Sequence, residues 1–200
     1  MVKTGYNYFM KEKQKSRDKL LDVTFEEVYR YGYCGAATTA ILKKAGVPKG
    51  SMYHHFGSKK GMVMTMIQER LIPKVREFFD FQMRKNATAV EILEHTMKKI
   101  ANNKMLIVYG CPLHRLMFEM DVLDRDISAL CEAEFANLST NLAKVLHFGM
   151  KEGSLKEGNA QEIAEYIIAS SWGFLSRPAA HSSKEQFLKD SRRLLESLQV

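Results

Sequence analysis

Apolar residues near the start of the chain recur at helical spacing. Four of them lie at i, i+4, i+7 and i+8, and they are Leu21, Phe25, Val28 and Tyr29. This spacing is typical of one buried face of a helix, so a helix is predicted over about residues 14–31. Gly32 follows the last apolar turn and marks its end, because glycine adopts the left-handed conformation that ends many helices.

Two short helices joined by a tight turn are expected next. Ile41 and Leu42 are the large apolar residues of the first helix, and Gly46 supplies the backbone freedom that a sharp turn requires. Pro48 fits the first turn of the second helix, whose early amides have no internal partner. With the second helix over about residues 49–56, the pair has the layout of a helix-turn-helix, whose second helix lies in the major groove of DNA.

The remainder of the chain is also read as helical, since no strand-like alternation of useful length occurs in it. Pro73 is expected to kink or end the first of these helices, because proline removes a backbone donor. The length of 200 residues suits a small domain of about 50 residues and a larger one of about 150. The expected helices cover about 59–80, 87–103, 104–109, 112–120, 124–152, 160–177 and 183–198.

A specific motif runs through the helix-turn-helix segment. Its residues are Gly32-Tyr33, Ile41, Ala45-Gly46-Val47, Lys49-Gly50-Ser51, Tyr53-His54-His55-Phe56 and Ser58-Lys59. In order and spacing this segment resembles the N-terminal signature of the TetR-like transcriptional regulators. The resemblance implies an all-α homodimer, with a three-helix DNA-binding domain at residues 1–58 and a helical bundle at 59–200 that binds a small effector and dimerises.

The resemblance also assigns roles to residues of the motif. Lys49 and Ser51 fall where bases are read, and Tyr53, His54 and Lys59 fall where phosphates are contacted. The chain departs from the family pattern at Ala36-Ala37, which removes a helix-capping hydroxyl that Thr38 or Thr39 is expected to replace. It also departs at Lys60, where the family usually has an acidic residue. The DNA-binding candidates are therefore Thr38, Thr39, Lys49, Gly50, Ser51, Tyr53, His54, Lys59 and Lys60.

Charge supports this interpretation independently. Residues 1–60 hold 12 Lys and Arg against 5 Asp and Glu, whereas residues 61–200 hold 18 of each kind, so the net charge of +7 lies entirely on the first segment. A segregated basic block is the expected electrostatic footprint of a nucleic-acid-binding domain. Lys59 and Lys60 in the first turn of a helix oppose its dipole, so an external anion such as DNA phosphate is expected beside them.

An apolar effector chamber is expected between helices of the second domain. Twelve methionines would make its walls adaptable, although such residues are more often ordinary core than pocket. His114 could orient a polar or anionic group together with Arg115 and Glu119, or could be a satisfied, partly buried histidine. The candidates are Met62, Met66, Phe79, Met105, Tyr109, Cys111, His114, Met117, Phe118, Phe135 and Trp172.

The last two helices carry apolar stripes that suggest a four-helix dimer interface, although each stripe must also bury part of itself in its own chain. Small residues such as Ala164 and Gly173 would allow close helix approach. A palindromic operator requires two reading helices spaced about 34–36 Å apart, which a dimer supplies. The expected interface residues are Ile163, Tyr166, Ile167, Ser170, Phe174, Phe187, Leu194, Leu195 and Leu198.

Other classes of protein find little support. Phosphate loops, nucleophile elbows and metal-ligand motifs are absent from the sequence, so neither an enzyme nor a cofactor or metal site is expected. No run of 18 apolar residues suggests a membrane span, and a cytoplasmic location is expected. Three unpaired cysteines leave open a redox-responsive alternative through Cys111 or Cys131. The other alternative is a constitutive DNA-binding protein whose second domain simply dimerises.

Overall fold

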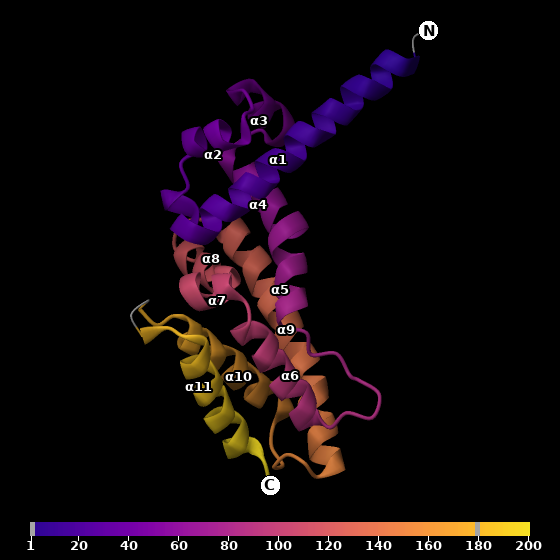
Figure 1. Ribbon diagram of the computed structural model, residues 1–200, viewed down its shortest axis with the longest axis vertical. Coiled ribbons are helices and arrows are strands. Elements are labelled where there is room, and N and C mark those ends of the chain that lie inside the picture. Colours follow the sequence, from indigo (N-terminus) through magenta and orange to yellow (C-terminus); the bar gives the residue numbers. More distant parts are fainter. Residues whose placement is uncertain (1–2, 179–180) are drawn as a thin grey trace.

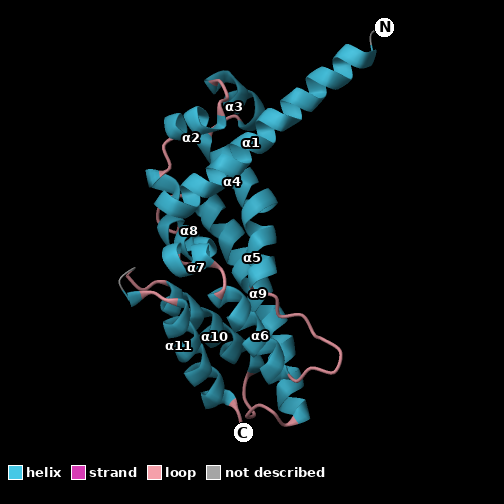
Figure 2. Cartoon of the chain, viewed as in Figure 1, coloured by secondary structure: helices cyan, strands magenta, loops and turns pink. Residues whose placement is uncertain are grey.

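The computed structural model describes the backbone of residues 3–178 and 181–200 and the side chains of residues 14–178 and 181–200. Every regular element in these ranges is a helix, apart from an isolated antiparallel bridge between Leu155 and Gln199 (Figure 2). The expected all-α class is therefore confirmed. Within the same ranges, none of the helices is both long and apolar enough to span a bilayer.

Three helices form the head of the molecule, at the end where α3 lies in Figure 1. They are α1 (Lys3–Gly35), α2 (Thr38–Ala45) and α3 (Lys49–Phe56). The first starts well before the predicted residue 14. Its regular part ends at Gly32, whose φ of 75° and ψ of −179° lie outside the helical region, so the predicted stop is confirmed.

A segmented helix connects the head to the rest of the chain. It consists of α4 (Lys59–Met66), a π-helical turn η1 (Ile67–Leu71) and α5 (Ile72–Phe78). Pro73 stands at the start of α5 and has no N–H for the carbonyl of Glu69, four residues earlier. That carbonyl instead accepts a long 3.4 Å bond from Arg70 Nη1. The wider turn spares the proline ring a clash, so the predicted disturbance takes the form of a π-bulge.

The remaining helices agree with the predicted segments to within a few residues. Their starts carry side-chain caps at Thr88, Asn103, Asp124, Asn159 and Ser183, each accepting a hydrogen bond from a free amide of the first turn. The helices are α6 (Ala89–Ala101), α7 (Lys104–Tyr109), α8 (Pro112–Met120), α9 (Arg125–Glu152), α10 (Ala160–Leu175) and α11 (Lys184–Leu198).

The core lies along α9, which packs against α8 and α10, while α11 packs on α6 (Figure 1). This packing corrects part of the expected dimer interface. Ile167, Phe187, Leu194 and Leu195 are 0–6% exposed and belong to the chain's own core. Their stripes face α6 and α9 rather than an open surface. Tyr166 remains 59% exposed, and the other expected interface residues are half-buried, namely Ile163, Ser170, Phe174 and Leu198.

Polar contacts fasten the head to α8. Arg115 Nη1 donates to the carbonyl oxygens of Tyr29 and Arg30 at 3.2 and 3.0 Å, at the end of α1. The carboxylate of Glu119 accepts from the backbone amides of Tyr33 and Cys34 at 2.8 and 2.9 Å. One face of α8 therefore holds the end of α1 and the turn into α2.

Candidate nucleic-acid interface and effector cavities

The turn between α2 and α3 is built by backbone capping. Gly46 has φ 63° and ψ 35°, and its amide closes the end of α2 on the carbonyl of Lys43. Val47 is buried and donates to the carbonyl of Leu42 at 3.2 Å. These bonds satisfy carbonyls that the end of a helix leaves free, and they fix the angle at which α3 leaves the turn.

The start of α2 differs from the expectation. Its N-cap is Ala37, and the structure gives that position no side-chain cap. Thr38 is the first helical residue and Thr39 the second, so neither hydroxyl stands at the capping position. The predicted replacement of the cap by Thr38 or Thr39 is therefore wrong. Both residues still lie on the first turn of α2, with Thr39 exposed.

The outer face of α3 is polar and open. Lys49, Gly50 and His54 are exposed, Tyr53 is 50% exposed, and Ser51 is half-buried. Met52 is 1% exposed and anchors the helix in the same buried cluster as α1 and α2. One buried anchor and a polar outer face are what a helix needs if it is to enter a groove of DNA.

Lys59 and Lys60 have partners within the chain. Lys59 Nζ donates to the carbonyl oxygen of Tyr33 at 2.6 Å and lies 4.6 Å from the centre of that ring. Lys60 Nζ lies 2.8 Å from Asp124 and 2.6 Å from Asp126, at the start of α9. Bonding to these carboxylates raises the pKa of Lys60 and lowers the pKa of Asp124. The anion expected beside Lys60 is thus supplied by the chain itself, which weakens its assignment as a phosphate contact.

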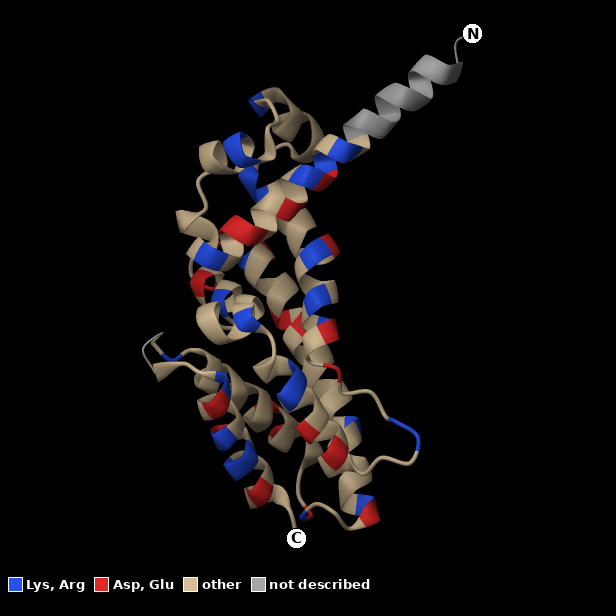
Figure 3. Cartoon of the chain, in the orientation of Figure 1, with Lys and Arg blue, Asp and Glu red and all other residues tan. Residues whose placement is uncertain are grey.

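A further basic residue on the head was not singled out from the sequence. Lys43 is exposed in the last turn of α2 and has no charged partner among the described residues. Its neighbour Lys44 differs, because it pairs with the buried carboxylate of Glu27. The helices α2 and α3 carry lysines and no acidic residue, whereas the lower part of the molecule mixes both signs (Figure 3). Knowing which of two adjacent lysines faces Glu27 required the packing of α1.

Lys49 and Lys43 are expected to affect DNA binding in different ways. Lys49→Ala should change which operator is preferred, because the start of α3 is the part that reaches base edges. Lys43→Ala should instead weaken binding to all duplexes alike and reduce the salt slope by about 0.9, the value for one phosphate contact. Competition of each variant across a randomised duplex pool at several salt concentrations separates the two effects. An unchanged preference profile for Lys49→Ala would remove it from the base-reading set.

The expected effector residues do not form one chamber. Met62, Met66, Phe79, Cys111 and Trp172 are 0–4% exposed and belong to the packed core, whereas Phe118 is 81% exposed. Phe79 borders a cavity of about 370 Å³ between α5 and α9. A second cavity of about 420 Å³ lies between the head and α8. Four of the candidates border this second cavity, and they are Tyr109, Cys111, His114 and Phe118.

His114 is held in place by Trp172. Their rings stack with centroids 4.6 Å apart and planes 18° from parallel, and Phe135 lies 5.2 Å from the same indole. Burial lowers the pKa of His114 and so favours its neutral form. Trp172 Nε1 is buried without a hydrogen-bond partner among the described residues. The half-buried candidates Met105 and Met117 pack against the core and border neither of these two cavities.

The cysteines lack the environment of a redox sensor. Burial raises the pKa of the Cys111 thiol to about 11 and that of the Cys131 thiol to about 12. The exposed Cys34 lies beside the Glu119 carboxylate, which raises its thiol pKa as well. Since the thiolate is the reactive form, these surroundings disfavour oxidation. The structure therefore does not support the redox-responsive alternative.

Known proteins resemble this chain both in its N-terminal part and over most of its length. Residues 20–65 match the family model described as bacterial regulatory proteins, tetR family. The HTH-type transcriptional repressor DhaR of Mycobacterium sp. strain GP1 is 25% identical over 86% of this chain and 88% of its own length. The fatty acid metabolism regulator protein of Bacillus subtilis is 24% identical over 80% of each chain. A TetR-family regulator from Agrobacterium tumefaciens has the same fold, with a TM-score of 0.81 at 23% identity over 94% of this chain and 100% of its own.

Proposed function

We propose that this chain, a TetR-like transcriptional regulator, acts as a dimeric repressor that leaves a palindromic operator when a small, largely apolar effector binds. The observation that carries the proposal is the outer face of α3, where Lys49, Tyr53 and His54 are exposed beside a buried anchor. DNA binding by the head follows from that face, and the remaining steps concern how the second domain controls it.

Two heads must be held at the spacing of successive major grooves, about 34–36 Å. The exposed side of α10 is the surface proposed for pairing, because Tyr166 is 59% exposed and Ala169 and Gly173 on the same side leave room for a second helix. The charged outer side of α11, with Lys189 and Arg193 exposed, would lie at the rim of that contact. Apolar centres with charged rims are typical of protein interfaces.

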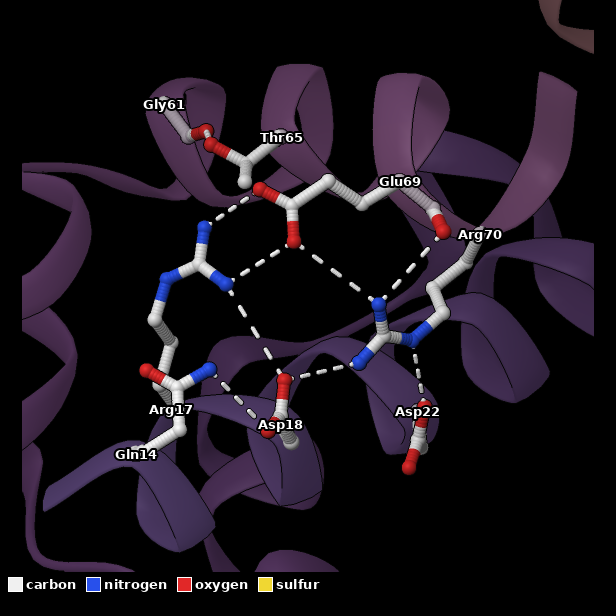
Figure 4. Close-up of polar contacts among 8 residues, drawn as sticks. All are labelled: Gln14, Arg17, Asp18, Asp22, Gly61, Thr65, Glu69 and Arg70. Atoms are coloured by element: carbon white, nitrogen blue, oxygen red, sulfur yellow. Dashed lines mark hydrogen bonds and ion pairs between the residues drawn. The ribbon is translucent and has the colours of Figure 1, made fainter. Parts of the chain in front are cut away.

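The head and the second domain are coupled through the segmented helix that joins them. Arg17 of α1 forms a two-bond ion pair with Glu69 in η1. Arg70 in the same turn reaches back to Asp18 at 2.9 Å and to Asp22 at 2.7 Å (Figure 4). Because Arg17 lies beside it, the pKa of Glu69 is lowered. The π-bulge is thereby bonded directly to α1, so a change in its geometry would move the head.

Movement of α4 and α8 is the proposed route from effector to DNA. The head is attached to α4 by Lys59, which donates to the carbonyl of Tyr33, and to α8 by Arg115 and Glu119. An effector that shifts either helix would change the spacing of the two heads. A difference in affinity of about 1–3 kcal/mol between the two arrangements would give a 5- to 150-fold response, and DNA must oppose effector binding by the same factor.

The apolar nature of the effector is inferred from the walls available to it. Aromatic and sulfur-containing side chains border the cavity at α8, including Tyr109, Cys111 and Phe118. A volume of about 420 Å³ is in the range of small-molecule sites. The related Bacillus protein is named as a regulator of fatty acid metabolism, which is compatible with an effector that carries an apolar body.

Selection of binding sites by the full-length protein tests the proposal. Randomised duplexes enriched by the purified chain are expected to contain an inverted repeat bound by two chains, with half-sites about one helical turn apart. Tyr53→Ala should lower affinity for the selected operator, and a metabolite mixture from the producing cell should reduce operator occupancy. Enrichment of sequences without two-fold symmetry, or binding as a single chain, would contradict a dimeric repressor.

A further inference from the structure

The cavity between the head and α8 joins two parts of the molecule that move relative to one another in the proposed function. We call it the seam groove, and its volume is about 420 Å³. Tyr31 enters it from the end of α1, and the remaining walls come from α7, α8 and the end of α10. The side chains used below are Tyr31, Tyr109, His114, Arg115, Phe118 and Glu119.

Aromatic rings form the walls of the seam groove. Tyr31 is 53% exposed and Phe118 is 81% exposed. His114 is fixed by its stack on Trp172, with centroids 4.6 Å apart. A flat ligand that stacks on exposed aromatic rings displaces water from them. Each pair of rings then contributes about 0.5–1.5 kcal/mol beyond the contribution of the buried area. This wall suits a planar, aromatic body.

The polar end of the groove is cationic. Arg115 uses Nη1 for both of its bonds to the α1 carbonyls, which leaves Nε and Nη2 without a partner among the described residues. Nε and Nη2 form the side of a guanidinium that binds a carboxylate through two parallel bonds. Arg30 lies 5.8 Å from the centre of the Tyr109 ring and adds a second positive charge.

The one carboxylate of the groove is already occupied. Both oxygens of Glu119 accept backbone amides, those of Tyr33 and Cys34. The neutral form of His114 is favoured because burial lowers its pKa. Glu119 keeps its negative charge but is already bound by two amides, so Arg115 in the wall and Arg30 beside Tyr109 leave one positive charge in excess near the groove, which favours an anion.

We propose that the seam groove binds a small aromatic carboxylate, with its ring between Tyr31 and Phe118 and its carboxylate on the free side of Arg115. This inference rests on the proposed function, since it names the effector class and the place where it acts. A ligand held by Tyr31 of the head and Arg115 of α8 bridges the two parts. By contacting both parts, it would shift α8 relative to the head, which is the movement by which the proposed effector changes the spacing of the two heads.

The binding test uses 2-naphthoate and its neutral analogue 2-naphthamide with the full-length protein. Calorimetry is expected to show one naphthoate per chain and binding of the amide weaker by about tenfold or more, because the charge-assisted bonds are lost. Arg115→Gln should weaken naphthoate to the level of the amide, and Phe118→Ser should weaken both ligands. Arg192→Gln is the matched control, since Arg192 is an exposed arginine on α11 that borders a different cavity.

Equal binding of acid and amide, or an equal loss in Arg192→Gln, would overturn the assignment of the groove. Arg115→Lys provides a check on folding, because it keeps the charge and loses the two-bond geometry, and it should retain part of the affinity. The operator assay separates the two hypotheses. If the protein binds naphthoate but no operator, only the proposed repressor function is refuted. If other compounds release the operator and naphthoate does not bind, only the assignment of the seam groove as the effector site is refuted.

Discussion

Gly32→Ala is expected to destabilise the protein by about 3–5 kcal/mol. Gly32 has φ 75° and ψ −179°, a region that is essentially restricted to glycine and costs other residues about 1–3 kcal/mol. A methyl group there would also lie 2.5 Å from Oε2 of Glu119. Glu119 cannot move aside freely, because its carboxylate holds the amides of Tyr33 and Cys34. The free energy of unfolding in urea is the measurement.

Gly46→Ala is the matched control for this substitution. Gly46 also has a positive φ, 63°, but a Cβ added there meets no atom within 4 Å. Its cost should therefore be the backbone term alone, about 1 kcal/mol. In the background Glu119→Ala, Gly32→Ala should cost clearly less than in the parent, because the contact with the carboxylate is gone. Equal costs for Gly32→Ala and Gly46→Ala would show that Glu119 does not hold the turn.

Operator affinity is expected to fall with Gly32→Ala for the same reason. The turn at Gly32 sets the direction in which α2 and then α3 leave α1, and Glu119 ties this turn to α8. Gly46→Ala should have a smaller effect, since its site leaves room for the added methyl group. Affinity measured at a temperature where each variant is fully folded separates this effect from the loss of stability.

Helix boundaries were predictable because local signals define them. Glycine and proline stand at the predicted ends, and Gly32 and Gly46 play the expected roles. Pro73 predicted a disturbance of the helix, which takes the form of a π-bulge. In this bulge Arg70 bonds both the Glu69 carbonyl and Asp18 of α1. Local sequence therefore specified where helices begin and end, and tertiary contacts decided how the disturbed turn was accommodated.

The placement of side chains was less predictable, because a helical stripe does not say which partner buries it. Phe187 and Leu194 have the spacing of an interface, yet α6 covers them within the same chain. Phe118 was grouped with buried candidates by residue type and is instead exposed at the seam groove. Lys60 was assigned to DNA because a lysine in the first turn of a helix calls for a nearby anion. That anion is supplied by Asp124 and Asp126, which are 64 and 66 residues away in sequence and adjacent in space. These contacts are long-range, so periodicity carries no information about them.

Removing Arg76 is the second substitution with a large expected effect. Glu134 of α9 is 3% exposed. Its oxygens accept from Arg76 Nε at 2.9 Å and Nη2 at 2.7 Å. Arg76→Met leaves this carboxylate buried with a single weak bond from Asn137 at 3.4 Å. Breaking a buried pair costs about 3–5 kcal/mol, and about 2–3 kcal/mol is expected here because the Arg76 side chain is 58% exposed and partly screened by water.

The double variant Arg76→Met/Glu134→Met distinguishes an unpaired charge from lost packing. Replacing both partners with apolar side chains removes the buried charge, so most of the lost stability should return. Arg84→Ala is a control on a nearby pair, because Arg84 and Asp80 are 3.5 Å apart and partly exposed, which predicts a cost below about 1 kcal/mol. A double variant as unstable as Arg76→Met would mean that the guanidinium stabilises α5 by packing rather than by neutralising Glu134. The pair joins the end of the segmented helix to α9, so recovery of stability without recovery of effector response would assign Arg76 to the transmission of the signal.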